Sequence, residues 1–67
     1  MTDAADLSSL ASSLDDLTRR VTAQAEAAQG GARTEVAAEL FEVERALRNA
    51  LRRLDKLVRA ERPPGAP

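Results

Sequence analysis

The stretch "VAAELFEVERALRNALRRLDKL", residues 36–57, carries an apolar residue at every third or fourth position. The steps alternate between four and three through Val36, Leu40, Val43, Leu47, Ala50, Leu54 and Leu57. A mean spacing of about 3.5 residues is typical of coiled-coil-like helices, because it keeps one apolar face turned toward a partner helix. The stretch therefore predicts a long helix with one apolar face.

The first half of the chain repeats the pattern with steps of three and four. Its members are Leu7, Leu10, Leu14, Leu17, Val21, Gln24 and Ala28. Between the two series lies "QGGAR", residues 29–33, whose glycines end a helix and permit a left-handed cap. We therefore expect a helix over 3–28, a turn over 29–33 and a second helix over 35–61.

The expected helix ends follow from their flanking residues. Thr2 or Asp3 suits the N-cap of the first helix, and Thr34 suits that of the second. Pro63 and Pro64 stop the second helix, because the residue before a proline avoids the helical region. The remaining residues, 63–67, are expected to form a disordered proline-rich tail.

A short connection makes neighbouring helices antiparallel, so the expected fold class is all-α, a coiled-coil-like helical hairpin over residues 1–62. Folding about the turn brings Leu14 near Leu47. The first helix is acidic near its start and the second is basic near its end, so Asp3 is expected close to Arg59. This charge complementarity is one use for the uneven distribution of charge.

The chain is too short to bury a large core alone. Chains of about 60 residues bury only about 60% of their unfolded surface and need disulfides, metals or oligomerisation. The 67 residues include no cysteine and no histidine, which leaves oligomerisation. The apolar arc of the second helix spans roughly 120°, wider than a two-helix contact hides. We therefore expect a homodimer that forms a four-helix bundle, with contacts from Leu51, Val58, Leu47, Leu54, Leu14 and Ala11. The alternative is a monomeric hairpin that orders only on a different partner.

Catalytic chemistry is not expected from this composition. Histidine, cysteine and tyrosine are absent, so the serines lack an activating base. Phosphate-binding glycine fingerprints and metal-ligand spacings are missing as well. No catalytic, metal or cofactor-binding residue is therefore predicted, and the chain is expected to be non-enzymatic.

One group of residues falls opposite the apolar arc on an ideal helical wheel. It consists of Phe41, Arg45, Arg48, Arg52 and Arg59. An aromatic side chain ringed by arginines could anchor an acidic, apolar protein groove, or could stack a base and bind phosphate. Two other interpretations need no ligand: Phe41 packs under the stem of Arg45, or the helices are rotated from the ideal wheel and Phe41 joins the dimer contact.

The leading hypothesis is a homodimeric helical hairpin that binds another protein as an adaptor or regulator. Binding of nucleic acid or an anionic nucleotide is the second hypothesis, and the net charge of −1 argues against it. No apolar run approaches the roughly 20 residues that span a bilayer, and the acidic start is unlike a secretory signal. A cytoplasmic location without membrane contact is expected, and the arginine- and alanine-rich composition favours a bacterial source.

Overall fold

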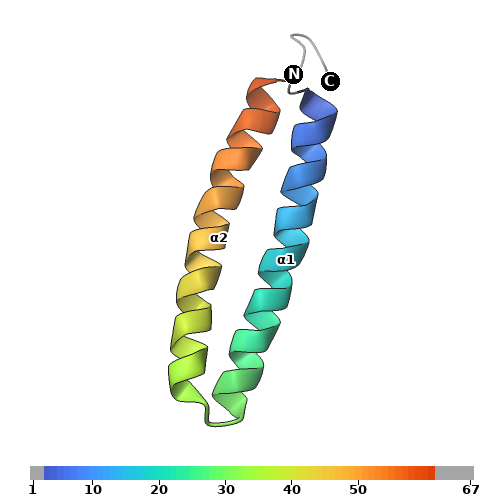
Figure 1. Ribbon diagram of the computed structural model, residues 1–67. Coiled ribbons are helices and arrows are strands. Elements are labelled where there is room, and N and C mark those ends of the chain that lie inside the picture. The colour runs from blue at the N-terminus through green and yellow to red at the C-terminus, as the bar shows by residue number, and fades with distance from the viewer. Residues whose placement is uncertain (1–2, 62–67) are drawn as a thin grey trace.

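The computed structural model describes residues 3–61, which form two long helices joined by a tight turn (Figure 1). Helix α1 spans Ala4–Gly30 and helix α2 spans Thr34–Ala60, each 27 residues. At 1.5 Å per residue, each helix is about 40 Å long. The helices lie side by side and antiparallel, which confirms the predicted all-α helical hairpin. The predicted tail, 63–67, lies outside the described residues.

The two helices begin differently. Asp3 has extended backbone angles, and its Oδ1 accepts a hydrogen bond from the backbone N–H of Asp6 at 2.8 Å. This is the expected N-cap arrangement, which satisfies one otherwise unpaired donor of α1. Thr34 is instead the first residue of α2, and the N-cap position falls on Arg33, whose side chain makes no capping hydrogen bond. The predicted cap at Thr34 is therefore wrong by one position.

The turn is a Schellman motif displaced by one residue from the glycines. The N–H of Arg33 donates to the carbonyl of Ala28 at 2.8 Å, and the N–H of Ala32 donates to that of Gln29 at 3.2 Å. These two bonds define the motif and require a left-handed residue at its centre. That residue is Ala32, with φ 62°, whereas Gly31 has φ −90° and Gly30 ends α1. The expectation that a glycine takes the left-handed position is therefore wrong.

Replacing Ala32 with glycine is expected to stabilise the hairpin. A left-handed conformation costs an L-residue roughly 1–2 kcal/mol, and the extra chain entropy of glycine offsets about 0.5–1 kcal/mol of the relief. We expect a net gain of about 0.5–1 kcal/mol in the free energy of unfolding, which urea denaturation of the variant and the wild type would measure. Ala38→Gly, inside α2, should instead lose about 1 kcal/mol. A urea midpoint for Ala32→Gly below that of the wild type would contradict the inference that the left-handed conformation of Ala32 is strained.

The contact between α1 and α2 is built on small residues. A row spaced by seven residues runs along α1 through Ala4, Ala11, Thr18 and Ala25, and the last three are buried. Across from it on α2, Ala37 is only 3% exposed. Small side chains let two helices pack closely, so α1 turns its alanine row toward α2. The leucine series beside that row is only partly covered.

Candidate functional site

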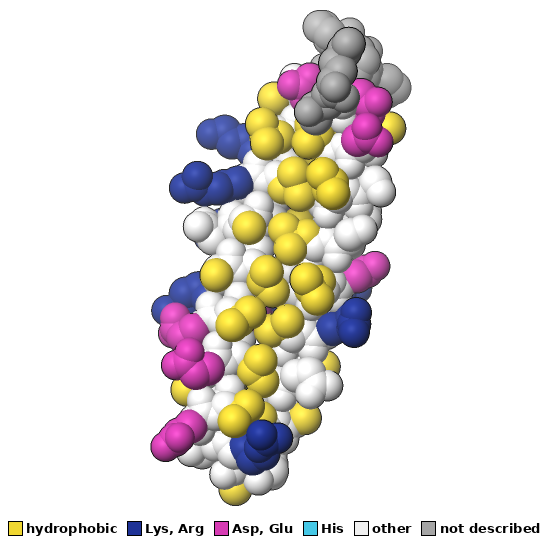
Figure 2. Space-filling view, in the orientation of Figure 1, with side chains coloured by type: hydrophobic (Ala, Val, Ile, Leu, Met, Phe, Trp, Pro, Cys, Tyr) yellow, Lys and Arg dark blue, Asp and Glu magenta, His cyan; other side chains and the backbone are white. Residues whose placement is uncertain are grey.

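An uncovered apolar face runs along one side of the hairpin. Five large hydrophobic residues remain substantially exposed: Leu10 at 57%, Leu17 at 45%, Val36 at 38%, Val43 at 44% and Leu57 at 51%. Hydrophobic side chains from both helices gather along the line between them, over most of their length (Figure 2). We call these five residues the apolar face. Contiguous exposed apolar patches are typical of interaction sites in proteins.

The apolar face follows directly from the heptad spacing. Leu10 and Leu17 lie seven residues apart on α1, and Val36, Val43 and Leu57 lie seven or fourteen apart on α2. Each helix therefore has two apolar rows, of which the hairpin covers one and leaves the other in solvent. The covered row of α1 includes Leu7 and Ala28, which are buried beside the alanine row, and that of α2 consists of half-buried leucines. That the remaining leucines and valines are core residues of a four-helix bundle stays a prediction.

A shallow groove lies between the helices on this side. Leu17, Val21 and Gln24 of α1 line it together with Leu40 of α2. The groove shows that residues of both helices contribute to one surface. Gln24 is exposed there, so its amide reaches solvent and has no buried hydrogen bond to satisfy.

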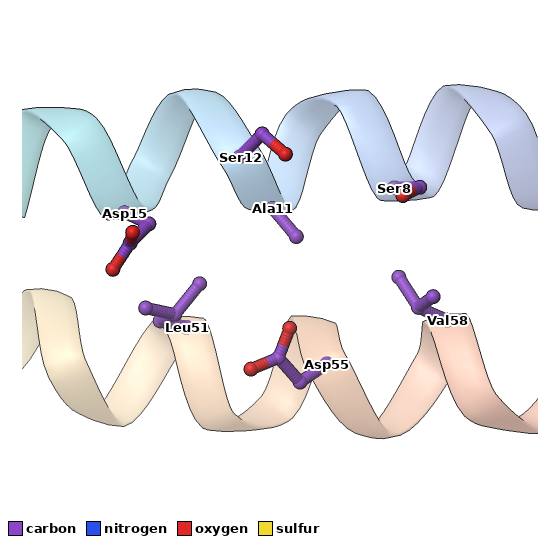
Figure 3. A pocket seen from close by; sticks show the side chains of 7 residues that line it. All are labelled: Ser8, Ala11, Ser12, Asp15, Leu51, Asp55 and Val58. Atoms are coloured by element: carbon purple, nitrogen blue, oxygen red, sulfur yellow. The ribbon is translucent and has the colours of Figure 1, made fainter.

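The residues predicted as dimer contacts differ in how far the single hairpin buries them. Ala11 is buried between α1 and α2, whereas the remaining members are half-buried: Leu14, Leu47, Leu51, Leu54 and Val58. Leu51 and Val58 point toward α1 across a hollow that Ser8, Ser12, Asp15 and Asp55 also line (Figure 3). The hollow is mainly polar at its rim. Ala11 and these two α2 residues thus pack within the hairpin.

Phe41 does not lie opposite the apolar residues, as the ideal wheel placed it. The side chain is half-buried, one turn from the buried Ala37 and close to the half-buried Glu44 on the same helix. Helix α2 is rotated so that these three positions lie toward α1. The rotation of α2 is therefore part of the single hairpin, and a dimer contact of Phe41 stays a prediction.

The arginines predicted beside Phe41 are exposed, and several have partners on their own helix. Arg45 pairs with Glu42 at 3.5 Å, and Arg48 pairs with Glu44 at 3.1 Å. Arg52 donates to the side-chain oxygen of Asn49 at 3.3 Å. Each of these three arginines therefore has a polar partner on its own helix. Arg59 is also exposed, beside Arg52 and Lys56 around a shallow depression.

Ion pairs between the helices were expected, and the described residues form none. The three ion pairs within 3–61 each join residues one turn apart, including Arg19 with Asp15 at 3.2 Å. Asp3 and Arg59 do not pair. Residues three or four apart on a helix are neighbours already, so local pairs form without ordering a second helix.

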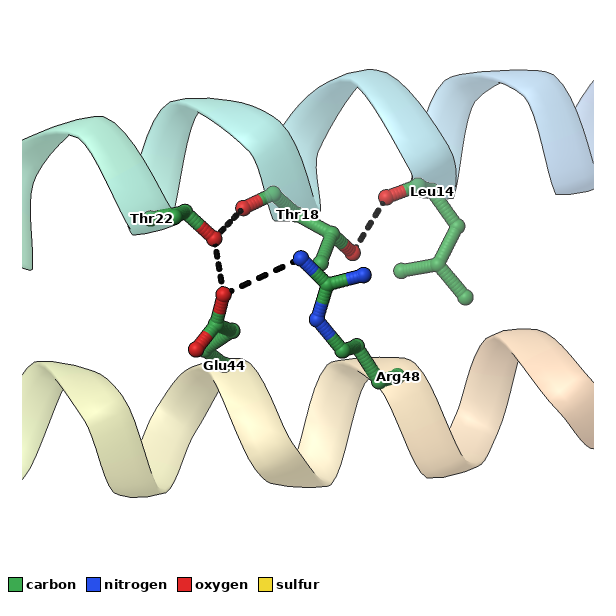
Figure 4. A network of polar contacts seen from close by, with 5 residues as sticks. All are labelled: Leu14, Thr18, Thr22, Glu44 and Arg48. Atoms are coloured by element: carbon green, nitrogen blue, oxygen red, sulfur yellow. Dashed lines mark hydrogen bonds and ion pairs between the residues drawn. The ribbon is translucent and has the colours of Figure 1, made fainter.

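A polar network connects the helices near their middle (Figure 4). The Thr18 hydroxyl, on a side chain that is 1% exposed, donates to the carbonyl of Leu14 at 2.7 Å. The Thr22 hydroxyl lies 3.1 Å from the carbonyl of Thr18 and also contacts the carboxylate of Glu44. A hydroxyl has one hydrogen, and the ionised carboxylate is the stronger acceptor. Thr22 therefore donates to Glu44, and this hydrogen bond joins α1 to α2.

The same contacts perturb one acid. The hydroxyl of Thr22, and then the guanidinium of Arg48, hold the pKa of Glu44 below its ordinary value. Both interactions favour the ionised carboxylate. The four-residue spacing of Glu44 and Arg48 predicts their pair, but the apolar pattern does not point to Thr18 or Thr22. The available signal was the position of Thr18 within the seven-residue row of small residues.

Because the pKa of Glu44 is depressed on folding, the charged form adds stability above the unfolded pKa, about 4.3. That contribution disappears as the pH falls through the lower folded pKa. We expect the wild-type chain to resist urea better than Glu44→Gln at neutral pH, and the difference to vanish in acid. Glu39→Gln, which alters an exposed carboxylate on the same helix, is the control. An equal Glu44→Gln effect at both pH values would contradict this.

Comparison with known proteins does not extend this description: no protein-family model, curated protein or solved structure matches the chain. Neither described helix has a segment long and apolar enough to cross a membrane. Within residues 3–61, no three acidic side chains come together as a set of metal ligands. The apolar face is thus the surface with the clearest physical consequence.

Proposed function

We propose that the protein is a non-enzymatic protein–protein interaction module, a small adaptor or regulator that works as a homodimeric four-helix bundle. The observation that carries the proposal is the apolar face. Its large side chains are spaced by heptads on both helices, and the hairpin itself leaves them 38–57% exposed. Covering such residues is the main driving force for association.

The size of the chain supports the same proposal. A 67-residue chain without cysteine has no disulfide to compensate for a small core. Much of the existing contact consists of alanine and threonine, which bury less apolar area than leucine does. A second hairpin placed on the apolar face would supply the missing core.

The test is sedimentation equilibrium of the wild-type chain at tens of micromolar. We expect a species of twice the chain mass, with dissociation on dilution. A single species of chain mass at that concentration would overturn the homodimer.

In such a bundle, the exposed Arg45, Arg52 and Arg59 stay on the outside and are the surface left for a further partner. Exposed arginines are complementary to an acidic protein surface, which could replace the Glu42 partner of Arg45. Nucleic-acid binding has less support, because Phe41 is half-buried and a base cannot stack fully on it. Binding to mixed nucleic acid at low salt, lost steeply as salt rises, would favour that alternative.

A further inference from the structure

We infer that the second copy binds the apolar face with its turn at the opposite end, so that α2 packs antiparallel against α2 of the other copy. This inference rests on the proposed homodimer and adds the orientation of its partner. It predicts which residues meet across the interface. Three features of the chain carry it.

The uncovered row of α2 is matched to itself in the antiparallel direction. It consists of Val36, Val43, Ala50 and Leu57, all exposed. When two identical helices lie antiparallel, residues that face each other have numbers with a constant sum. A sum of 93 pairs the whole row, Val36 with Leu57 and Val43 with Ala50, so a larger residue always meets a smaller one.

The outer edge of α2 is self-complementary in charge under the same alignment. Acidic side chains gather at its turn end and basic ones at its other end (Figure 2). Antiparallel packing places Glu39 near Arg53 of the other copy and Glu35 near Lys56 of the other copy. All four side chains are exposed in the single hairpin. Opposite charges beside an apolar contact determine partner orientation in coiled coils.

The geometry of the hairpin allows one two-fold axis to serve both helices. From the helix bounds, Leu17 is the midpoint of α1 and Leu47 is the midpoint of α2. The row of α1, Leu10, Leu17 and Gln24, also maps onto itself about Leu17. The α2 alignment has its centre between Ala46 and Leu47. An axis across the middle of the hairpin therefore satisfies both helices, and the two copies overlap along their full length.

The opposite choice, with both turns at one end, places α1 against α2 of the other copy. In that orientation Asp6 lies near Lys56 of the other copy, and Arg20 lies near Glu42 of the other copy. Glu42 already pairs with Arg45 within its own hairpin. In the same alignment Glu39 and Arg53 are level with Ala23 and Ser9, which offer no charge. The self-complementary edge of α2 would then have no role, so we assign the orientation with opposite turns.

Spin labels on single cysteines test this orientation, because the chain has no cysteine of its own. Gln29→Cys places a label on an exposed residue beside the turn. Pulsed electron paramagnetic resonance should give an intermolecular distance of about 40 Å, the length of a helix. Turns at the same end would give less than about 20 Å, since bundled helices lie 8–10 Å apart. The short distance would overturn the inference.

A second label distinguishes a wrong orientation from the absence of a dimer. It is placed at Asn49→Cys, which is exposed near the middle of α2. It should show an intermolecular distance in either orientation, because the middle of the rod stays close to its partner. That distance together with a short Gln29 distance would overturn the orientation alone. Its absence, at a concentration where the wild type sediments as a monomer, would overturn the homodimer as well.

Charge reversal provides an independent measurement of the pairing along the edge. Glu39→Arg alone or Arg53→Glu alone should weaken the dimer about tenfold, because each change affects two equivalent pairs. The double variant, Glu39→Arg with Arg53→Glu, should return to within about threefold of the wild-type dissociation constant. Additive weakening in the double variant would overturn the contact between these residues.

Discussion

Leu17→Glu is expected to convert the dimer to monomer. In the single hairpin, Leu17 is 45% exposed and leucine and glutamate have similar helix propensity, so the change costs one copy little. In the dimer, Leu17 lies at the two-fold axis, and both copies lose an apolar contact and gain a charge. Burying a fully exposed leucine stabilises by about 1.5–3 kcal/mol. Covering the 45% of Leu17 that the hairpin leaves exposed therefore contributes about 0.7–1.4 kcal/mol per copy, or about 1.4–2.7 kcal/mol for two copies. The lost apolar contact alone should therefore raise the dissociation constant roughly 10- to 100-fold, and the two introduced charges should raise it further.

The measurement is sedimentation equilibrium across a dilution series, with helix content followed by circular dichroism. Ser12→Glu is the matched control, because it adds the same charge to an exposed residue of α1 beside the polar hollow. That variant should remain a dimer. An unchanged dissociation constant for Leu17→Glu would show that the apolar face is not the contact between copies.

The heptad rows and the glycine pair were enough to predict two antiparallel helices. They did not predict which apolar row faces the neighbouring helix. A hydrophobic pattern marks both rows equally, and the choice depends on how closely two backbones can approach. The structure places the alanine row in the hairpin, with Ala25 at 0% and Ala37 at 3% exposure. The resulting rotation explains why the expected position of Phe41 is wrong.

The turn and the polar network were harder to predict for local reasons. Glycine is the usual residue in the left-handed position of a helix end, yet Ala32 occupies it one residue after the glycine pair. Thr18 and Thr22 have no hydrophobic signal, and their bond to Glu44 depends on the rotation of α2. The apolar face, in contrast, needs only the observation that each helix has more apolar positions than one neighbour can cover.

Ala25→Leu tests the close helix contact and should act on the fold itself. Ala25 has no exposed surface and lies in the part of α1 next to the turn, where the short connection holds the helices together. Leucine adds three carbon atoms where the packing leaves no room. Overpacking of this kind costs about 1–3 kcal/mol, and more where the backbone cannot move apart. We expect the free energy of unfolding to fall by at least that amount in urea denaturation.

Ala27→Leu is the control, since Ala27 is exposed on the same helix and leucine is nearly as good a helix former as alanine. Both variants must be compared at one protein concentration, because dimerisation contributes to apparent stability. Equal stability of the two variants would mean that α1 and α2 are not in close contact beside the turn. A loss confined to Ala25→Leu, next to a loss of association confined to Leu17→Glu, would separate the two apolar rows of α1 by function. The alanine row would then be assigned to the fold and the leucine row to the partner.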